Sequence, residues 1–126
     1  MTAQQWYANG NPKYSVWMVD GKFHRTDGPA VYQWYNNGAL KSELWFTEGN
    51  YHRTDGPALC KWSNGTLQSE SYFINGKYFT EVKFRRMIAR KSLQDKILRS
   101  SRLLTLGEEV HILPRDTLSV IGGFLE

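Results

Sequence analysis

The sequence predicts an α+β fold, in which an antiparallel sheet of β-hairpins is followed by a basic helical segment and a short C-terminal tail. Three observations predict it: a repeated string with regularly spaced glycine turns, an aromatic content of 14%, and a change in composition at Thr80. At 126 residues the chain is long enough for one domain with a core. We therefore expect a single domain over residues 1–126, made of a repeat sheet (14–79), basic helices (80–106) and a tail (107–126).

The overall composition excludes several classes of protein. A mean hydropathy of −0.55, with 40% hydrophobic residues, is typical of neither a membrane-spanning nor a disordered chain. The single cysteine, Cys60, cannot form an internal disulfide or a multi-thiolate metal site. Residues 1–10 contain no apolar segment of the kind found in secretion signals. We expect a cytoplasmic protein without a membrane span.

An internal repeat organises the first two thirds of the chain. The string HRTDGPA occurs at 24–30 and again at 52–58, an offset of 28. The flanking sequence repeats at the same offset, since residues 17–23 correspond to 45–51 and Trp34 corresponds to Trp62. Trp6 lies outside the repeats in this alignment.

After Trp34 and Trp62 the offset falls to 27, because the turn at 36–38 is one residue longer than the turn at 64–65. A third copy begins at Tyr72. It breaks where Phe79 replaces the histidine of the string and Thr80 replaces the arginine.

Each repeat is predicted to form β-hairpins, because short aromatic and β-branched runs alternate with turn dipeptides that end in glycine. These dipeptides are Asp20-Gly21, Asn37-Gly38, Glu48-Gly49, Asn64-Gly65 and Asn75-Gly76. The expected strands cover residues 14–19, 22–24, 30–35, 40–47, 50–52, 58–62, 66–74 and 77–79. Sequential hairpins without crossover helices make an antiparallel meander.

The repeat unit G-x-x-H-R-x-D-G-P-A, with an aromatic pair before the glycine, resembles a known family. It is similar to the MORN-type repeats of bacterial YwqK-like antitoxin proteins and of bacteriophage and giant-virus proteins. The resemblance covers roughly residues 14–78. It implies successive β-hairpins in one elongated sheet and a scaffolding or interaction role, and it brings no catalytic residue.

Residues 80–102 contain no glycine or proline and have apolar residues at helical spacing. Thr80 is the expected N-cap, and a second capping signal at Ser92 and Asp95 leaves open whether this segment is one helix or two. Eight basic residues against two acidic ones give the segment a net charge of +6, and the rest of the chain carries −2. In the tail, we expect a strand at 109–113 and an apolar segment at 118–121, and we expect tail and helices to pack on the sheet.

The repeated His-Arg-x-Asp sequence resembles a general base with its orienting carboxylate. Catalysis rarely duplicates its acid-base pair at a fixed repeat interval, whereas an arginine and an aspartate can lock an Asp-Gly-Pro turn. We therefore predict six structural lock residues and no catalytic residue, metal site or cofactor. The lock residues are His24, Arg25, Asp27, His52, Arg53 and Asp55.

Partner-binding residues are expected in two places. The repeated tryptophans are candidates for either the sheet core or a contact surface, and Trp17 and Trp45 are the predicted contact residues. On the helical segment, Lys83, Arg86 and Arg90 share one face and are joined by Arg99.

From these features we expect a non-enzymatic protein-binding module whose partner has an acidic surface. The family resemblance implies a phage or mobile-element product that inhibits or neutralises a host or toxin protein by occupying its surface. The alternative is a nucleic-acid-binding protein that uses the basic helices.

Overall fold

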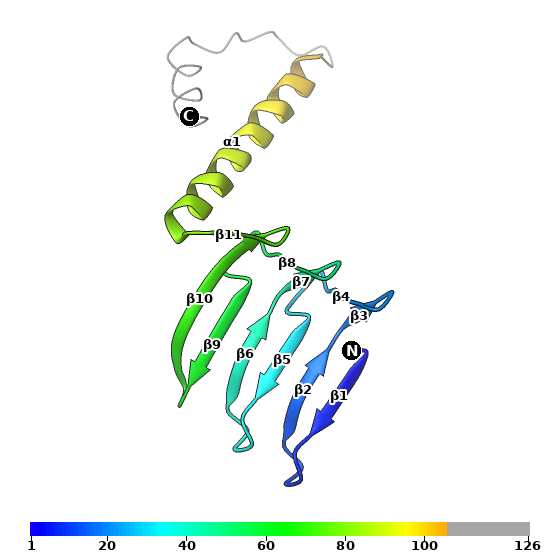
Figure 1. Ribbon diagram of the computed structural model, residues 1–126. Helices are drawn as coiled ribbons and strands as arrows, with labels where there is room; N and C mark the ends of the chain where they lie inside the picture. The colour runs from blue at the N-terminus through cyan, green and yellow to red at the C-terminus, as the bar shows by residue number, and fades with distance from the viewer. Residues whose placement is uncertain (106–126) are drawn as a thin grey trace. The chain divides into compact units, whose positions relative to one another are not determined.

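The computed structural model describes residues 1–105, and its main feature is a seven-stranded antiparallel sheet (Figure 1). The strand order is β1-β2-β5-β6-β9-β10-β11. These strands are β1 (Ala3–Trp6), β2 (Pro12–Val16), β5 (Val31–Trp34), β6 (Leu40–Leu44), β9 (Leu59–Ser63), β10 (Thr66–Ile74) and β11 (Lys77–Phe79). Two small hairpins lie between the long ones: β3 (Met18–Val19) with β4 (Lys22–Phe23), and β7 (Phe46–Thr47) with β8 (Asn50–Tyr51). The predicted α+β class and meander-like order are confirmed.

The sheet begins at Ala3, before the predicted start at residue 14. Gln5-Trp6-Tyr7 is followed by Asn9-Gly10, and the same pattern recurs 28 residues later as Gln33-Trp34-Tyr35 with Asn37-Gly38. The two tyrosines make the same contact, since Tyr7 donates to the Trp34 carbonyl at 2.7 Å and Tyr35 donates to the Trp62 carbonyl at 2.9 Å. Strand β1 is therefore part of a further, partial repeat, and placing Trp6 outside the repeats was wrong.

The small hairpins close with two-residue turns in which both residues have a positive φ. At Asp20-Gly21 the φ angles are 52° and 75°, and at Glu48-Gly49 they are 50° and 82°. Two consecutive left-handed residues are the requirement of a type I′ turn, which matches the twist of the flanking strands. The glycines predicted from the sequence therefore set the hairpin spacing.

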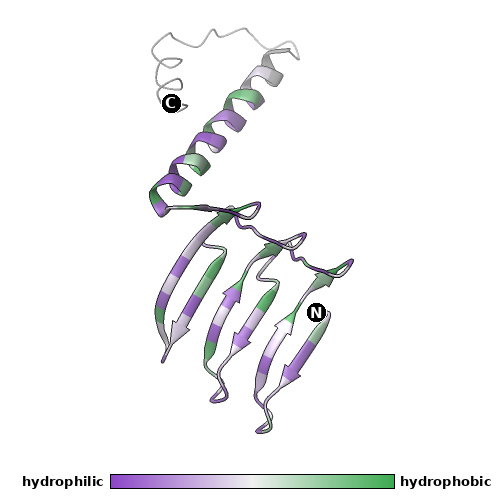
Figure 2. Cartoon of the chain, in the orientation of Figure 1, coloured by the Kyte–Doolittle hydropathy of each residue, from purple (hydrophilic) through white to green (hydrophobic). Residues whose placement is uncertain are grey.

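The core of the sheet lies where the small hairpins join the long strands. Ala30 and Ala58, which occupy the same position in successive repeats, are fully buried. Val16, Val31, Cys60 and Tyr72 are also buried. Figure 2 shows that the long strands carry both hydrophobic and hydrophilic residues.

A row of aromatic rings in contact with one another ties the small hairpins together. Phe46 lies 5.3 Å from Phe23 and 4.4 Å from Tyr51, measured between ring centroids. The row continues from Tyr51 to Phe73 at 4.9 Å and from Phe73 to Tyr78 at 5.7 Å. Each hairpin therefore contacts the next through aromatic side chains.

Residues Glu81–Thr105 form the single helix α1, so the alternative of two helices is wrong. The predicted apolar stripe is the less exposed side of α1, with Phe84 buried and Ile88, Leu93 and Ile97 half-buried. Within the described residues no helix combines the length and the apolar character needed to cross a membrane. The described residues divide into two compact units between Glu81 and Val82. The predicted tail elements at 109–113 and 118–121 lie outside the described residues, and packing of helix and tail on the sheet stays a prediction.

The aromatic row gives a prediction about stability. Phe46→Ala removes a ring with two ring neighbours, and we expect a loss of about 2 to 3 kcal/mol in the free energy of unfolding, below the range for a fully buried phenylalanine. Tyr78→Ala is the matched control, because Tyr78 ends the row and is 59% exposed; its loss should stay under about 1 kcal/mol. Chemical denaturation measures both, and equal losses would show that the row does not couple the hairpins.

Candidate functional site

The two HRTDGPA loops, at 24–30 and 52–58, each connect a small hairpin to the next long strand. Both loops dock on the following repeat through the backbone. The Arg25 N–H donates to the Phe46 carbonyl at 3.1 Å, and the Arg53 N–H donates to the Phe73 carbonyl at 3.2 Å. The loops are therefore the joints between neighbouring repeats.

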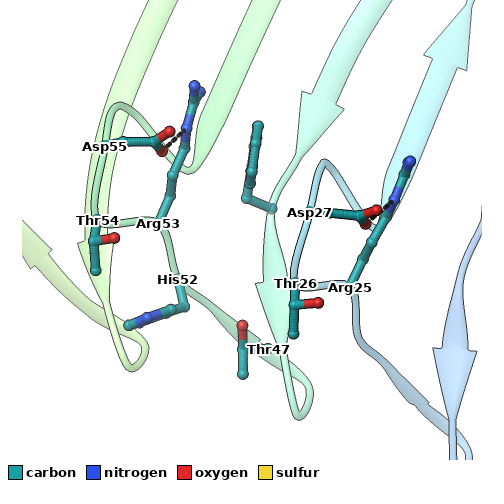
Figure 3. A pocket seen from close by; sticks show the side chains of 9 residues that line it. Arg25, Thr26, Asp27, Thr47, His52, Arg53, Thr54 and Asp55 are labelled. Atoms are coloured by element: carbon teal, nitrogen blue, oxygen red, sulfur yellow. Dashed lines mark hydrogen bonds and ion pairs between the residues drawn. The ribbon is translucent and has the colours of Figure 1, made fainter.

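The arginine of each loop holds the loop closed (Figure 3). Arg25 Nε donates to Asp27 Oδ1 at 3.0 Å and its Nη1 donates to the Pro29 carbonyl at 3.1 Å. Arg53 repeats these contacts with Asp55 at 2.8 Å and with the Pro57 carbonyl at 3.1 Å. The arginine–aspartate contact predicted from the sequence is present in both loops.

The guanidinium group of each arginine is also enclosed from two sides. Arg25 Cζ lies 3.9 Å from the ring centroid of Trp17, a cation–π contact. A Cβ added to Gly28 would lie 2.9 Å from the same Cζ atom. Arg53 lies in the same way between Trp45 and Gly56, at 3.9 Å and 2.9 Å. A side chain at this glycine would therefore push the arginine away from its tryptophan and its hydrogen-bond partners, a reason for glycine that the sequence alone did not reveal.

The histidine of each loop binds the next hairpin rather than the aspartate. His24 Nδ1 accepts the backbone N–H of Glu48 at 3.0 Å, and His52 Nδ1 accepts that of Asn75 at 3.0 Å. Because Nδ1 is the acceptor, the proton of the neutral ring is on Nε2. The histidine and the aspartate of each loop thus have separate partners, which is not the arrangement of a general base with its orienting carboxylate.

A groove of about 470 Å³ lies between the two loops (Figure 3). Its lining comprises Arg25, Thr26, Asp27, Trp45, Thr47, His52, Arg53, Thr54 and Asp55. The arginine and aspartate side chains that line it are already paired with each other, and Trp45 Nε1 is buried without a hydrogen-bond partner. Among residues 1–105, no group of three or more His, Cys, Asp or Glu side chains is placed to hold a metal ion.

Behind the loops, burial governs the electrostatics of the sheet. Burial, together with repulsion from Glu43 and Glu70, raises the pKa of Cys60 to about 11, with Arg53 acting in the opposite direction. Burial also raises the pKa of Glu43, again offset in part by Arg53. The thiol of Cys60 is therefore protonated and buried at neutral pH, which makes it unreactive.

The predicted partner-binding residues fall into two groups. Trp17 and Trp45 belong to the sheet unit, where they are half-buried under the arginines. On α1, Lys83, Arg86 and Arg99 are exposed and Arg90 is half-buried. The structure thus brings the tryptophans together with the lock residues of their own unit, and a contact role for either predicted group stays a prediction.

The chain matches no protein-family model, no curated protein and no solved structure. The roles of its residues therefore follow from its own geometry and from the repeat.

The arginine contacts give a prediction about the lock. Arg53→Lys should lower the free energy of unfolding by about 1 to 3 kcal/mol, because an ammonium group cannot reproduce the Nε and Nη1 contacts together with stacking on Trp45. Arg99→Lys, at an exposed position on α1, is the matched control and should change it by less than about 0.5 kcal/mol. Thermal and chemical denaturation measure both, and a wild-type stability for Arg53→Lys would contradict the lock.

Cys60 gives a prediction about pH and about labelling. It is the one cysteine of the chain, so a thiol reagent reports on this residue alone. The folded-state pKa of about 11 lies above the ordinary value of 9.0, so the thiol contributes stability below pH 9 that is lost as the pH rises toward 11. A thiol reagent at pH 8 should label the native protein slowly and the denatured protein rapidly, and adding denaturant should speed labelling in step with unfolding. Rapid labelling of the native protein would show that Cys60 is accessible and activated.

Proposed function

We propose that the chain is a non-enzymatic protein-binding module, in which the repeat sheet is a rigid scaffold and helix α1 contacts an acidic surface of another protein. The observation that carries the proposal is the charge of α1. Between Glu81 and Ser101 its basic residues are Lys83, Arg85, Arg86, Arg90, Lys91, Lys96 and Arg99, and its acidic residues are Glu81 and Asp95. All of these basic residues except Arg90 are exposed.

Concentrated charge of one sign on an exposed helix steers an oppositely charged partner toward it and speeds the encounter. A continuous helix of 25 residues also presents this charge on one rigid element. The excess is concentrated on this helix, since the whole chain carries a net charge of only +4.

The sheet supports the scaffold role because the arginine and histidine side chains of both loops are used within the fold. The arginines bind aspartates and proline carbonyls, and the histidines bind the next hairpin. The resemblance of the repeats to those of antitoxin and phage proteins favours a host or toxin protein as the partner, and the cytoplasm as the place of binding.

A protein is favoured over nucleic acid for two reasons. The aromatic residues that could stack on bases lie in the sheet unit and are not interleaved with the basic residues of α1. Within residues 1–105, α1 also has no second helix of the kind that positions a DNA-reading helix in a groove. Phosphate binding requires neither feature, so nucleic acid is the outcome against which the proposal is tested.

The test compares three forms of the immobilised full-length chain in an extract of its native host. They are the wild type, the charge reversal Lys83→Glu/Arg86→Glu/Arg90→Glu, and the control Lys13→Glu/Lys41→Glu/Lys61→Glu, which removes the same charge from exposed positions on the sheet. We expect wild type and control to retain the same nuclease-resistant protein and the α1 variant to lose it. Added salt should slow association of the purified partner, because the encounter is electrostatic.

A second measurement decides between protein and nucleic acid. At physiological salt, wild-type binding to random DNA or RNA should be no tighter than the nonspecific range, roughly 10⁻⁴ to 10⁻⁶ M. Submicromolar binding that the α1 reversal abolishes and the sheet reversal leaves intact would replace the proposal with a nucleic-acid-binding function.

A further inference from the structure

The sheet has two outer edges without a strand partner in the described part of the chain. Strand β1 pairs with β2 alone. Strand β10 pairs with β9 along its length, but β11 covers only the segment Tyr72–Ile74 on its other side. The segment Thr66–Ser71 of β10 therefore has an outer edge lined by exposed side chains up to Glu70.

These two edges are the two halves of a junction that already occurs twice inside the sheet. By repeat position, β1, β5 and β9 are equivalent, and so are β2, β6 and β10. The interior junctions are β2 with β5 and β6 with β9. In both junctions, a strand from the set β2, β6 and β10 pairs with a strand from the set β1, β5 and β9. A pair of β10 with β1 would be of the same type.

We propose that copies of this chain associate head to tail, with β10 of one copy pairing antiparallel with β1 of the next. The register follows from the interior junctions, where Ser15 pairs with Tyr32 and Glu43 pairs with Cys60. The repeat offset of 27 takes Glu43 to Glu70, and two offsets of 28 take Cys60 back to Gln4. Glu70 of one copy would therefore pair with Gln4 of the next. The flanking pairs are then Ser71 with Ala3 and Ser69 with Gln5.

Exposed apolar side chains gather at the same two ends of the array. At the first end Trp6 is 60% exposed and Val19 is 53% exposed; at the last end Leu67 is 43% exposed and Tyr78 is 59% exposed. Their interior counterparts Trp34, Leu40 and Tyr51 are half-buried. Continuing the repeat would bury these side chains, and it would place Met18 of the next copy against Tyr78, a favourable contact of sulfur with an aromatic ring.

Neither edge carries the charged or proline residues that commonly protect an edge strand from pairing. Each edge strand has a β-bulge, at Gln5/Trp6 and at Leu67/Ser69, but the interior pair β5–β6 has one at Gln33/Trp34 and is paired on both sides. Lysine, proline and inward-pointing charges are the usual guards of an edge strand. Residues 3–6 contain no charge, and residues 66–71 contain only Glu70, which would face the amide of Gln4. Thr80 of one copy occupies the repeat position of Arg53, and Thr2 of the next copy occupies the later position of Ala58. The sheets of the two copies therefore do not fill the same position of the repeat twice.

A head-to-tail contact uses two different surfaces, so it does not close on a two-fold axis and extends into chains or rings. Each added copy would bring its own basic helix. Self-association would therefore increase the avidity of binding to a partner with several acidic sites.

The test uses the full-length chain with Cys60→Ala, so that introduced cysteines are the only thiols. Directly opposed residues of an antiparallel pair have Cα atoms about 4.5 to 5.5 Å apart, within the range of a disulfide. Gln4→Cys and Glu70→Cys in one chain should give a ladder of disulfide-linked multimers on mild oxidation. The matched control combines Gln4→Cys with Lys41→Cys on the central strand β6, and it should give no ladder.

Single variants decide the direction of pairing. Mixing chains with Gln4→Cys alone and Glu70→Cys alone should give one cross-linked heterodimer, whereas a homodimer of either variant would show two-fold pairing of like edges and overturn the proposal. Sedimentation of the wild-type protein provides a measurement without any substitution. The average mass should rise with concentration beyond the dimer and should not fall as salt is added. A monomer at all concentrations, or a species that stops at the dimer, would overturn the proposal.

Discussion

The enclosed guanidinium group is the interaction on which the repeat architecture depends. A hairpin by itself is only marginally stable in water, so each hairpin of the sheet must be attached to its neighbour. Arg25 holds closed the loop that makes this attachment. Its backbone N–H binds the Phe46 carbonyl of the next repeat, and its guanidinium group is fixed by two donated hydrogen bonds, a tryptophan ring on one side and a glycine on the other. Its side chain is only 23% exposed while Asp27 is 82% exposed, so the sheltered contacts of the charge are those with the Pro29 carbonyl and the Trp17 ring. The arginine, aspartate, glycine and proline of the string all serve this one contact.

The sheet could be predicted because its signals are local. Glycine after aspartate, glutamate or asparagine specifies a tight turn without reference to the rest of the chain, and the repeated string marks its period. The role of the histidine could not be predicted, because its partner is a backbone N–H far along the sequence. His24 binds residue 48 and His52 binds residue 75, both at 3.0 Å. The contact is therefore the same in both repeats, although the turn at 64–65 is one residue shorter than the turn at 36–38. A backbone partner has no signature in the sequence.

Two parts of the structure were missed or left open for physical reasons. Strand β1 lacks the repeated string, and its only signal is the short pattern that Gln5-Trp6-Tyr7 shares with β5. The capping signal at Ser92 did not break α1, because the segment has no glycine or proline and extending a helix costs less than nucleating a second one.

The site shows the same limit, because hydropathy could not decide whether Trp17 lies in the core or at a surface. It lies between these extremes, half-buried under a loop that folds back over it.

The end of the repeat array explains why head-to-tail association would differ from the joints within a chain. An interior joint combines strand pairing, aromatic contacts, a histidine that binds the next hairpin and an enclosed arginine. At the last joint Phe79 and Thr80 stand where the histidine and arginine would be. A second copy would be held there by strand pairing and aromatic contacts alone. Its binding would also cost free energy for lost translational freedom, a cost that neighbouring repeats of one chain do not incur. Association between chains is therefore weaker than the joints within them, so copies exchange while each sheet stays folded.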